Sequence, residues 1–259
     1  MSSLTQQQIT NFIHLGFIKI ENAFPTAIAD ECRALLWKAT GCDPDKPETW
    51  IHPVIRIGDM KQEPFKNAVN TEILHNAFDQ LVGKDNWWPR ASLGTFPIRF
   101  PSNRPAGDTG WHVDSGFPGD NVNDFSTWRI NINSKGRALL MLFLFSDVAE
   151  HDAPTIIRIG SHLDVAKVLQ PEGEKGLSFM ELAQKLDSLP QREEALVTGK
   201  SGTVYLCHPF IVHAAQNHQG TTPKFMAQPP LHPKNDFNID KAEEQLCPVE
   251  KAILKGIRE

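Results

Sequence analysis

The chain has 259 residues, of which 40% are hydrophobic, and this length allows one substantial core in one or two domains. Its net charge of −5, with basic residues scattered along the chain, argues against nucleic-acid binding, which usually requires a basic face. The longest apolar run, "ALLMLFLF" at 138–145, is too short to span a bilayer, and the N-terminus lacks the pattern of a secretory signal. The four cysteines lie far apart without a C-x-x-C motif, so we expect reduced thiols in a soluble, cytoplasmic protein.

The first 89 residues predict a mainly helical part of the chain. Thr5 and Gln8 have the spacing of a capping box, and an apolar face with helical period follows them up to Gly16. The same period and its interruptions predict the following elements: a helix after Thr5, a strand at 17–20, a helix from Pro25 to Gly41, a loop over 42–60 and a helix over 64–82.

From about residue 90 the pattern changes to short β-rich runs separated by turn-forming residues. Such a series is typical of an antiparallel barrel or a double-sheet jelly roll. The runs are 91–100, 110–114, 127–132, 137–145, 154–159, 202–207, 210–215 and 224–231. We therefore expect a mainly β protein with flanking α-helices around a double-stranded β-helix, a cupin-like jelly roll. The expected domain plan is one domain over 1–259, with a helical part at 1–89, a jelly-roll core at 90–235 that carries a helical insert at 163–189, and a C-terminal helix within 236–259.

The stretch "GWHVDSGF" at 110–117 contains two residue types that bind divalent metals. On a strand, His112 and Asp114 point to the same face and Val113 points away, because side chains alternate. An imidazole beside a carboxylate suits a divalent metal, although an H-x-D pair alone is also common by chance on polar surfaces. A catalytic ion needs a third ligand, and a 2-His-1-carboxylate triad is the arrangement of non-haem iron oxygenases.

Several downstream histidines are candidates for this third ligand. His213 lies in the alternating run "IVHAA", where it can point into a barrel. His208 lies five residues earlier, before Pro209, and we expect it to cap the preceding strand. His162, in "IGSHLD", enters a predicted helix and is expected to make a structural hydrogen bond. The pattern therefore favours His213.

With His213 set beside "GWHVD", the chain resembles the phytanoyl-CoA dioxygenase family of iron(II)/2-oxoglutarate-dependent oxygenases. The resemblance covers most of the sequence: "GFIKIENAF" is similar to the family's usual start, "WHVD" to its first metal motif, "LFLFSDVAEHDAPTIIRIGSH" to its central segment and "VHAAQNHQGTTPKF" to its distal segment. Several motifs in the right order are far more specific than any one of them. The resemblance implies Fe(II) bound by His112, Asp114 and His213, with 2-oxoglutarate and O2 as co-substrates.

The resemblance also implies a basic residue that binds the distal carboxylate of 2-oxoglutarate. The matching position is Lys224, where the family usually has an arginine, and lysine offers a flexible point charge in place of a planar fork. Ala215 is a second departure, because many members have a small hydroxyl residue there. Arg99, on the strand before the metal motif, is the residue that we expect to compensate; the alternative for it is a solvated strand arginine.

A stretch rich in Gly, Asn and Asp, 115–132, is expected to cover the metal as a loop. Near its end, Trp128, Arg129 and Asn131 offer an aromatic plane, a cation and an amide, and they are the candidate substrate contacts. Arg129 and Asn131 share one face of an alternating strand, so Trp128 joins them in one pocket only if the strand bends. The alternative for Arg129 is an ion pair with an acidic neighbour such as Asp124.

These observations predict a non-haem iron(II)/2-oxoglutarate-dependent dioxygenase that hydroxylates a C–H bond of a small-molecule metabolite or natural-product intermediate. The alternatives are a cupin-type zinc hydrolase or isomerase that uses the same three ligands, and a metal-binding protein without turnover. Neither a nucleic-acid partner nor a membrane partner is expected. The sequence defines neither the oligomeric state nor the substrate.

Overall fold

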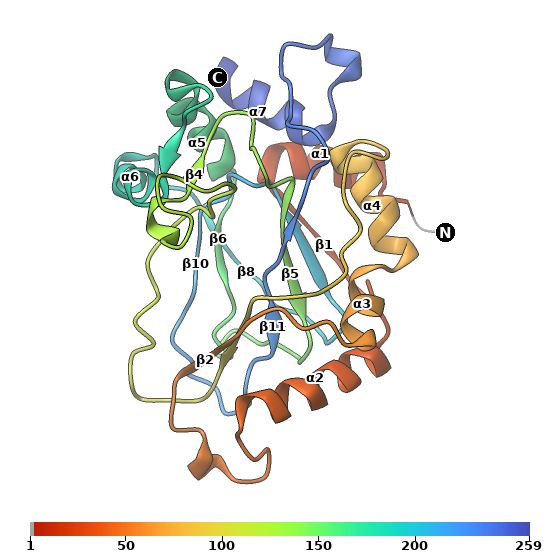
Figure 1. Cartoon of the computed structure of the whole chain (residues 1–259), viewed down its shortest axis with the longest axis vertical. Coiled ribbons are helices and arrows are strands. Elements are labelled where there is room, and N and C mark those ends of the chain that lie inside the picture. The colour runs from red at the N-terminus through yellow and green to blue at the C-terminus, as the bar shows by residue number, and fades with distance from the viewer. Residues whose placement is uncertain (1–2) are drawn as a thin grey trace.

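The computed structural model describes residues 3–259 and places β-sheets at the centre with helices packed around them (Figure 1). The described α-helices are α1 (Gln6–Leu15), α2 (Thr26–Thr40), α3 (Glu63–Val69), α4 (Glu72–Val82), α5 (Ser161–Leu169), α6 (Phe179–Lys185) and α7 (Pro248–Arg258). The described strands are β1 (Phe17–Ile20), β2 (Val54–Ile57), β3 (Phe96–Arg99), β4 (Arg129–Ile130), β5 (Leu139–Leu144), β6 (Ile156–Arg158), β7 (Leu177–Ser178), β8 (Glu194–Leu196), β9 (Val204–Cys207), β10 (His213–Ala214), β11 (Met226–Ala227) and β12 (Pro230–Leu231). Helix holds more of the described residues than strand does, so the content is mixed α/β rather than mainly β.

Two antiparallel sheets form the centre of the molecule. The larger has the order β1–β9–β5–β11, with β12 also paired to β5, and the smaller has the order β10–β6–β8. Single-residue bridges extend both sheets: Arg99 of β3 pairs with Lys224, and His112 pairs with His213 of β10. The expected double-sheet core is therefore present in outline, with strands shorter than the β-rich runs predict.

Strand β5 shows how the sequence divides the core in two. Its six residues, "LLMLFL", are all buried, and successive side chains point to opposite faces. Leu142 and its neighbours at alternate positions face an apolar cluster that includes Ile157 of β6 and Tyr205 of β9. Met141 and Phe143 face the other cluster, which is shared with the helices. Burial on both faces explains why this run is apolar without interruption.

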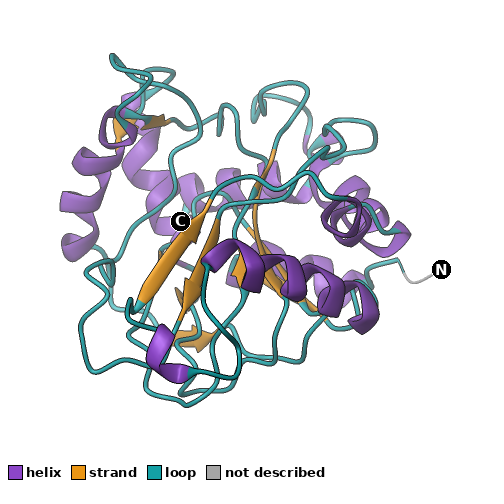
Figure 2. Ribbon diagram, turned by 60° about the horizontal axis from the view of Figure 1, so that its bottom comes forward, coloured by secondary structure: helices purple, strands orange, loops and turns teal. Residues whose placement is uncertain are grey.

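The N-terminal helices cover the outer face of the larger sheet, as Figures 1 and 2 show. Phe65 of α3 lies 5.2 Å from Phe96 of β3 between ring centroids. The predicted capping box of α1 is confirmed, and the helix ends at Gly16 with a φ of 87°. Glycine is required there, since a Cβ would also lie 2.5 Å from the ring of His162. No helix of the described chain is long and apolar enough to cross a membrane.

The prediction of one helix over 64–82 is wrong, because the chain forms two helices there. Thr71 caps α4 by accepting a hydrogen bond from the backbone N–H of Leu74. The Asn70 side chain donates to the carbonyl of Arg90, outside the helix. These two polar side chains favour a break that the apolar period does not reveal.

The predicted loop over 42–60 contains strand β2, which pairs antiparallel with β3. Its residues "VIRI" do alternate, but the prolines around them conceal the strand. The helical insert expected at 163–189 is present as α5 and α6, which β7 separates.

Candidate metal centre

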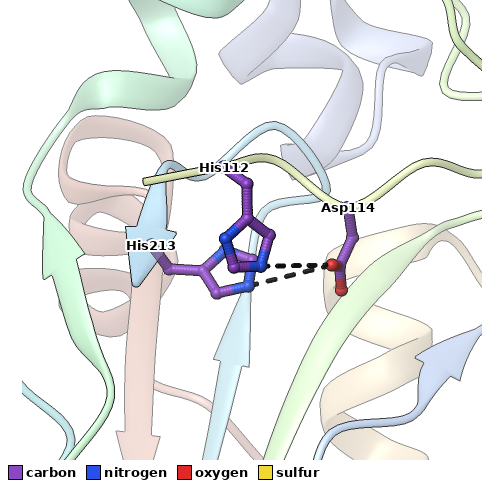
Figure 3. A group of neighbouring side chains, drawn as sticks. All are labelled: His112, Asp114 and His213. Atoms are coloured by element: carbon purple, nitrogen blue, oxygen red, sulfur yellow. Dashed lines mark ion pairs between the residues drawn. The ribbon is translucent and has the colours of Figure 1, made fainter. Parts of the chain in front are cut away.

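The structure brings His112, Asp114 and His213 together (Figure 3). Nε2 of His112 lies 3.7 Å from Oδ1 of Asp114, and Nε2 of His213 lies 3.9 Å from the same oxygen. All three potential ligand atoms lie within 4.8 Å of one another. The separations of 3.7 and 3.9 Å exceed hydrogen-bond length, and they leave room for a cation between the carboxylate and each imidazole, with metal–ligand bonds of roughly 2.1 Å.

Main-chain pairing sets the two histidines opposite each other. The N–H of His112 donates to the carbonyl of His213, and the N–H of His213 donates to the carbonyl of His112, each at 3.0 Å. Paired residues in antiparallel strands share one face, so the two imidazole rings lie with their centroids 4.3 Å apart. Asp114 follows His112 by two residues and turns its carboxylate to the same side.

Each imidazole is oriented by a carbonyl two residues before it. Nδ1 of His112 lies 2.9 Å from the carbonyl oxygen of Gly110, and Nδ1 of His213 lies 3.2 Å from that of Ile211. A carbonyl oxygen only accepts, so Nδ1 carries the proton and Nε2 presents its lone pair to the site. Nε2 of His213 is buried and has no hydrogen-bond partner within residues 3–259. Both rings are therefore prepared to donate to a metal.

The charge states of the three residues also suit a divalent cation. Burial lowers the pKa of His213 to about 4, and His112 adds to this against the opposing effect of Asp114. For Asp114, burial pushes the pKa upward, but the charges of Arg137 and the two histidines outweigh it and the pKa falls below its ordinary value. Near neutral pH, the ligand-free site therefore holds a neutral His213 and an ionised carboxylate, which are the forms that bind metals.

Arg137, which is not predicted from the sequence pattern, supports the carboxylate. Its Nη1 lies 3.3 Å from Oδ2 of Asp114, and its Nε and Nη2 donate to the carbonyl of Ser115 at 3.3 and 3.1 Å. A close crossing of two loops places it there, because a Cβ on Gly116 would lie 2.2 Å from the carbonyl oxygen of Lys135. One feature of the sequence could have indicated this role: an arginine stands two residues before a fully apolar strand.

Arg99 and Lys224 form a second cross-strand pair, again through two main-chain hydrogen bonds, of 3.0 and 2.8 Å. Both side chains are buried. Nη2 of Arg99 donates to Asp108 at 2.7 Å, whereas its Nη1 has no hydrogen-bond partner in the described part of the chain. Nζ of Lys224 donates to the carbonyl of Ala153. Burial and the charge of Arg99 hold the pKa of Lys224 well below its ordinary value, against the opposing effects of Asp108 and Asp152.

A cavity of about 1140 Å³ opens onto the three candidate ligands. Arg99, Ala215 and Thr155 line it, whereas Lys224 does not. Phe179 of α6 also lines the cavity, with its ring centroid 5.7 Å from that of His112. The cavity therefore combines the candidate metal site with a basic group and an aromatic surface.

Of the three candidate substrate contacts, Trp128 lines the cavity. Arg129 instead donates to the carbonyls of Lys175 and Gly176, at 2.8 and 2.7 Å. Asn131 donates to a carbonyl of the same segment at 3.0 Å. These two side chains therefore tie β4 to the segment that leads into β7.

The other two histidines considered for the metal lie apart from it in the core. Nε2 of His162 lies 3.0 Å from the carbonyl oxygen of Ile13, which confirms the expected structural hydrogen bond. His208 packs against it with ring centroids 4.9 Å apart and accepts a hydrogen bond from the N–H of Phe210.

No protein-family model matches the sequence, and no curated protein matches it. Solved structures do share the fold. HygX from Streptomyces hygroscopicus, crystallised with nickel and 2-oxoglutarate, is 19% identical with a TM-score of 0.57, and 87% of this chain and 86% of that chain are covered. SnoK, a non-haem α-ketoglutarate-dependent carbocyclase from nogalamycin biosynthesis, is 13% identical with a TM-score of 0.58 and coverages of 89% and 84%. SnoN, a non-haem α-ketoglutarate-dependent epimerase from the same biosynthesis, is 13% identical with a TM-score of 0.53 and coverages of 86% and 80%.

At these identities the likeness establishes the fold alone. Membership of the phytanoyl-CoA dioxygenase family stays a prediction, because no family model supports it.

Proposed function

We propose that the chain is an iron(II)/2-oxoglutarate-dependent oxygenase that acts on a small molecule. The observation that carries the proposal is the convergence of two imidazoles and one carboxylate within 4.8 Å, as a 2-His-1-carboxylate set. His112, Asp114 and His213 are the proposed iron ligands. The fold shared with HygX, which was crystallised with nickel and 2-oxoglutarate, supports the same cofactors here.

Arg99 is the proposed main contact for the distal carboxylate of 2-oxoglutarate, with Lys224 in support. Arg99 lines the cavity and is buried, and its Nη1 is free of hydrogen bonds within the described residues. Lys224 is instead turned toward the carbonyl of Ala153. A guanidinium holds a carboxylate through two parallel N–H donors, which an ammonium cannot do. In this proposal the arginine that the family carries at position 224 is replaced by one on the paired strand.

The hydroxyl that many family members carry at the position of Ala215 has a candidate substitute in Thr155. The register that pairs Ala214 with Ile156 sets Thr155 opposite Ala215, and both residues line the cavity. Thr155 is therefore proposed as a further donor to the co-substrate.

When bound, iron(II) with 2-oxoglutarate and O2 supplies the oxidising power to attack an unactivated C–H bond. The chain itself holds the reactants: Arg99 orients the co-substrate, and Trp128 and Phe179 exclude water and pack against the substrate. Hydroxylation is the proposed outcome. Ring closure and epimerisation are the outcomes to test beside it, since SnoK is a carbocyclase and SnoN an epimerase.

A zinc hydrolase with the same ligands would need a free general base beside the metal. Among the described residues that line the cavity, the carboxylates besides Asp114 are Asp59 and Asp108. Asp108 is paired with Arg99, and Asp59 accepts a hydrogen bond from Ser92. Both carboxylates also lie beside arginines, Asp108 beside Arg56 and Arg99 and Asp59 4.0 Å from Arg90. Because a neighbouring cation weakens a carboxylate as a base, the geometry favours the oxygenase.

The test is an anaerobic titration of the iron(II)-loaded protein with 2-oxoglutarate, in which the visible charge-transfer band of a chelated 2-oxo acid is followed. The band is expected in the wild type and in the control Asp147→Ala, which removes an exposed carboxylate paired with Lys200. It is expected to disappear in Asp114→Ala. If iron binds to the wild type but no band develops, the proposal fails and a metal-binding protein without turnover becomes the better interpretation.

A further inference from the structure

A second basic region of the cavity lies on the side of Asp114. It consists of Arg90, Arg137 and Gln228, which all line the cavity, and we call it the arginine subsite. Arg137 follows Gly136, whose carbonyl lies 2.9 Å from Nδ1 of His232. Nη1 of Arg90 donates at 2.6 Å to the carbonyl of Pro230, two residues before that histidine. A carbonyl of β12 therefore holds the guanidinium of Arg90, and the carbonyl of Ser115 holds that of Arg137.

The arginine subsite has unused capacity to bind an anion. The side chain of Arg137 is only 9% exposed. Its Nη1 lies 3.3 Å from Oδ2 of Asp114 but makes no hydrogen bond to it, or to any other residue in the part of the chain that the structure describes. Burial lowers the pKa of Arg90; the Asp59 carboxylate opposes this effect, and the charge of Arg137 adds to it. An anion between the two guanidinium groups would relieve their repulsion and accept a hydrogen bond from Nη1 of Arg137, which now has only its ion pair with Asp114.

The charge of the whole cavity favours the same ligand. Four arginines line it against three aspartates; they are Arg56, Arg90, Arg99 and Arg137, and Asp59, Asp108 and Asp114. A cation bound by Asp114 offsets the carboxylate charge that Arg137 now balances. The metal-loaded protein therefore attracts an anion to Arg137 more strongly than the metal-free protein does.

The cavity wall beside His112 is aromatic and apolar, in contrast to the basic arginine subsite. Phe179 lies against the His112 ring, and Phe125 lies 5.7 Å from Phe179 and 5.5 Å from Trp128 between ring centroids. Phe125 is 47% exposed, so this apolar wall is accessible from outside. The candidate metal site thus lies between an aromatic wall and the arginine subsite.

We propose that the substrate is a small organic acid whose anionic group binds the arginine subsite while its apolar or aromatic body packs against Phe179 and Trp128. The inference rests on the proposed oxygenase function and names the substrate class of that site. In this proposal the co-substrate carboxylate binds Arg99, which donates to Asp108, and the anionic group of the substrate binds Arg137, which donates to Ser115.

The experiment compares two probes of the same shape, 3-phenylpropanoate and its neutral amide, by isothermal titration calorimetry. The protein is used without metal, loaded with Ni(II), and loaded with Ni(II) and saturating 2-oxoglutarate. The acid is expected to bind at least about tenfold more tightly than the amide in the fully loaded protein, since a charge-assisted hydrogen bond distinguishes the two. The preference is expected to be smaller without metal.

Three variants test which arginines account for the preference for the acid over the amide. Arg137→Gln is expected to abolish the preference for the acid, and Arg90→Gln, which leaves the neighbour of Asp114 intact, is expected to reduce it. Arg258→Gln removes an arginine that is 62% exposed on α7, and it is expected to leave the preference unchanged. If Arg137→Gln does not fold, Arg90→Gln alone still tests the inference.

Equal affinity for acid and amide, or no binding of either probe, would overturn the inference. So would displacement of the acid by 2-oxoglutarate, because Arg137 would then serve the co-substrate. A failure of the proposed function is recognised separately: the charge-transfer band is missing while the preference for the acid remains. If the charge-transfer band develops but the acid binds no more tightly than the amide, the arginine subsite is rejected and the proposed function stands.

Discussion

Two cross-strand pairs lie close to the candidate site and share the same main-chain pairing. They differ in how many of their side-chain nitrogens already have hydrogen-bond partners. His112–His213 and Arg99–Lys224 each exchange two main-chain hydrogen bonds. In the histidine pair, both outer nitrogens are bonded to carbonyls and both inner nitrogens face the site. In the basic pair, Lys224 is bonded to a carbonyl and Arg99 is divided between Asp108 and a free nitrogen. The same backbone pairing thus supports a candidate metal site whose imidazoles are already oriented, and beside it a proposed carboxylate site whose arginine would have to exchange partners.

The largest expected effect comes from breaking the histidine pair. His213→Ala removes a nitrogen donor that no nearby side chain replaces, so we expect iron(II) affinity to fall by more than about 100-fold. Isothermal titration calorimetry under anaerobic conditions measures it. The control is His151→Ala, which removes an exposed histidine. Unchanged iron affinity in His213→Ala would contradict the assignment.

Breaking the basic pair is expected to affect the co-substrate and not the metal. Arg99→Gln removes a charged double donor, and we expect 2-oxoglutarate to bind about 10- to 100-fold more weakly while iron(II) affinity stays the same. The charge-transfer band reports the first quantity and calorimetry the second. Loss of affinity for both 2-oxoglutarate and iron(II) would mean that the variant disturbs the fold. If neither affinity changes, Arg99 does not bind the co-substrate.

The pH dependence of co-substrate binding separates Lys224 from its partner. Burial first, and then the charge of Arg99, lower the pKa of Lys224, so its amine loses its proton at a lower pH than an exposed lysine. As pH rises through that pKa, we expect 2-oxoglutarate affinity to fall by up to about tenfold, because the dianion loses one positive neighbour. Lys224→Arg keeps its charge and is expected to flatten the profile, with the exposed Lys200→Arg as control. Parallel profiles in Lys224→Arg and wild type would exclude this role.

The same shift affects folding with the opposite sign. The unfolded chain holds the Lys224 proton up to its ordinary pKa, whereas the folded chain releases it earlier. The unfolded state therefore binds more protons in that range, and the stability contributed by this group rises with pH. Chemical denaturation at several pH values checks the direction, with Lys224→Met as the reference.

The smallest expected effect comes from freeing Arg99. Asp108→Asn removes the carboxylate that accepts its hydrogen bond, so 2-oxoglutarate no longer competes with an internal anion. We expect its affinity to rise by about two- to fivefold, as is typical when a partly exposed ion pair is removed. A decrease in affinity would show that Asp108 positions Arg99 rather than competing with the co-substrate.

The shared face of His112 and Asp114 could be predicted from the sequence, because their i, i+2 spacing needs only strand geometry. Strand alternation favoured His213 as the third ligand, but only the resemblance to a known family implied that it joins the other two. The run at 137–145 likewise predicted a strand, which the structure shows as β5, buried on both faces.

The rest of the cavity could not be predicted in this way, because its wall comes from segments that meet only in the folded chain. Arg90, Arg137 and Gln228 lie far apart in the sequence and line one cavity in the folded chain, where a loop crossing at Gly116 positions Arg137. Arg129 was predicted to contact the substrate because of its strand and its charge. In the structure its guanidinium instead donates hydrogen bonds to the carbonyls of Lys175 and Gly176. Side-chain partners across long loops have no periodic signature in a sequence.

The carbonyl that orients each histidine lies two residues before it in the chain. Each imidazole is therefore oriented by a short segment of its own chain, which could be transferred together with it. The cavity wall around the two rings can be rebuilt, by evolution or by an engineer, without realigning them. Asp114 is the exception, because its support, Arg137, is itself part of that wall. Any redesign of the pocket toward a new ligand is free to begin almost anywhere except at residue 137.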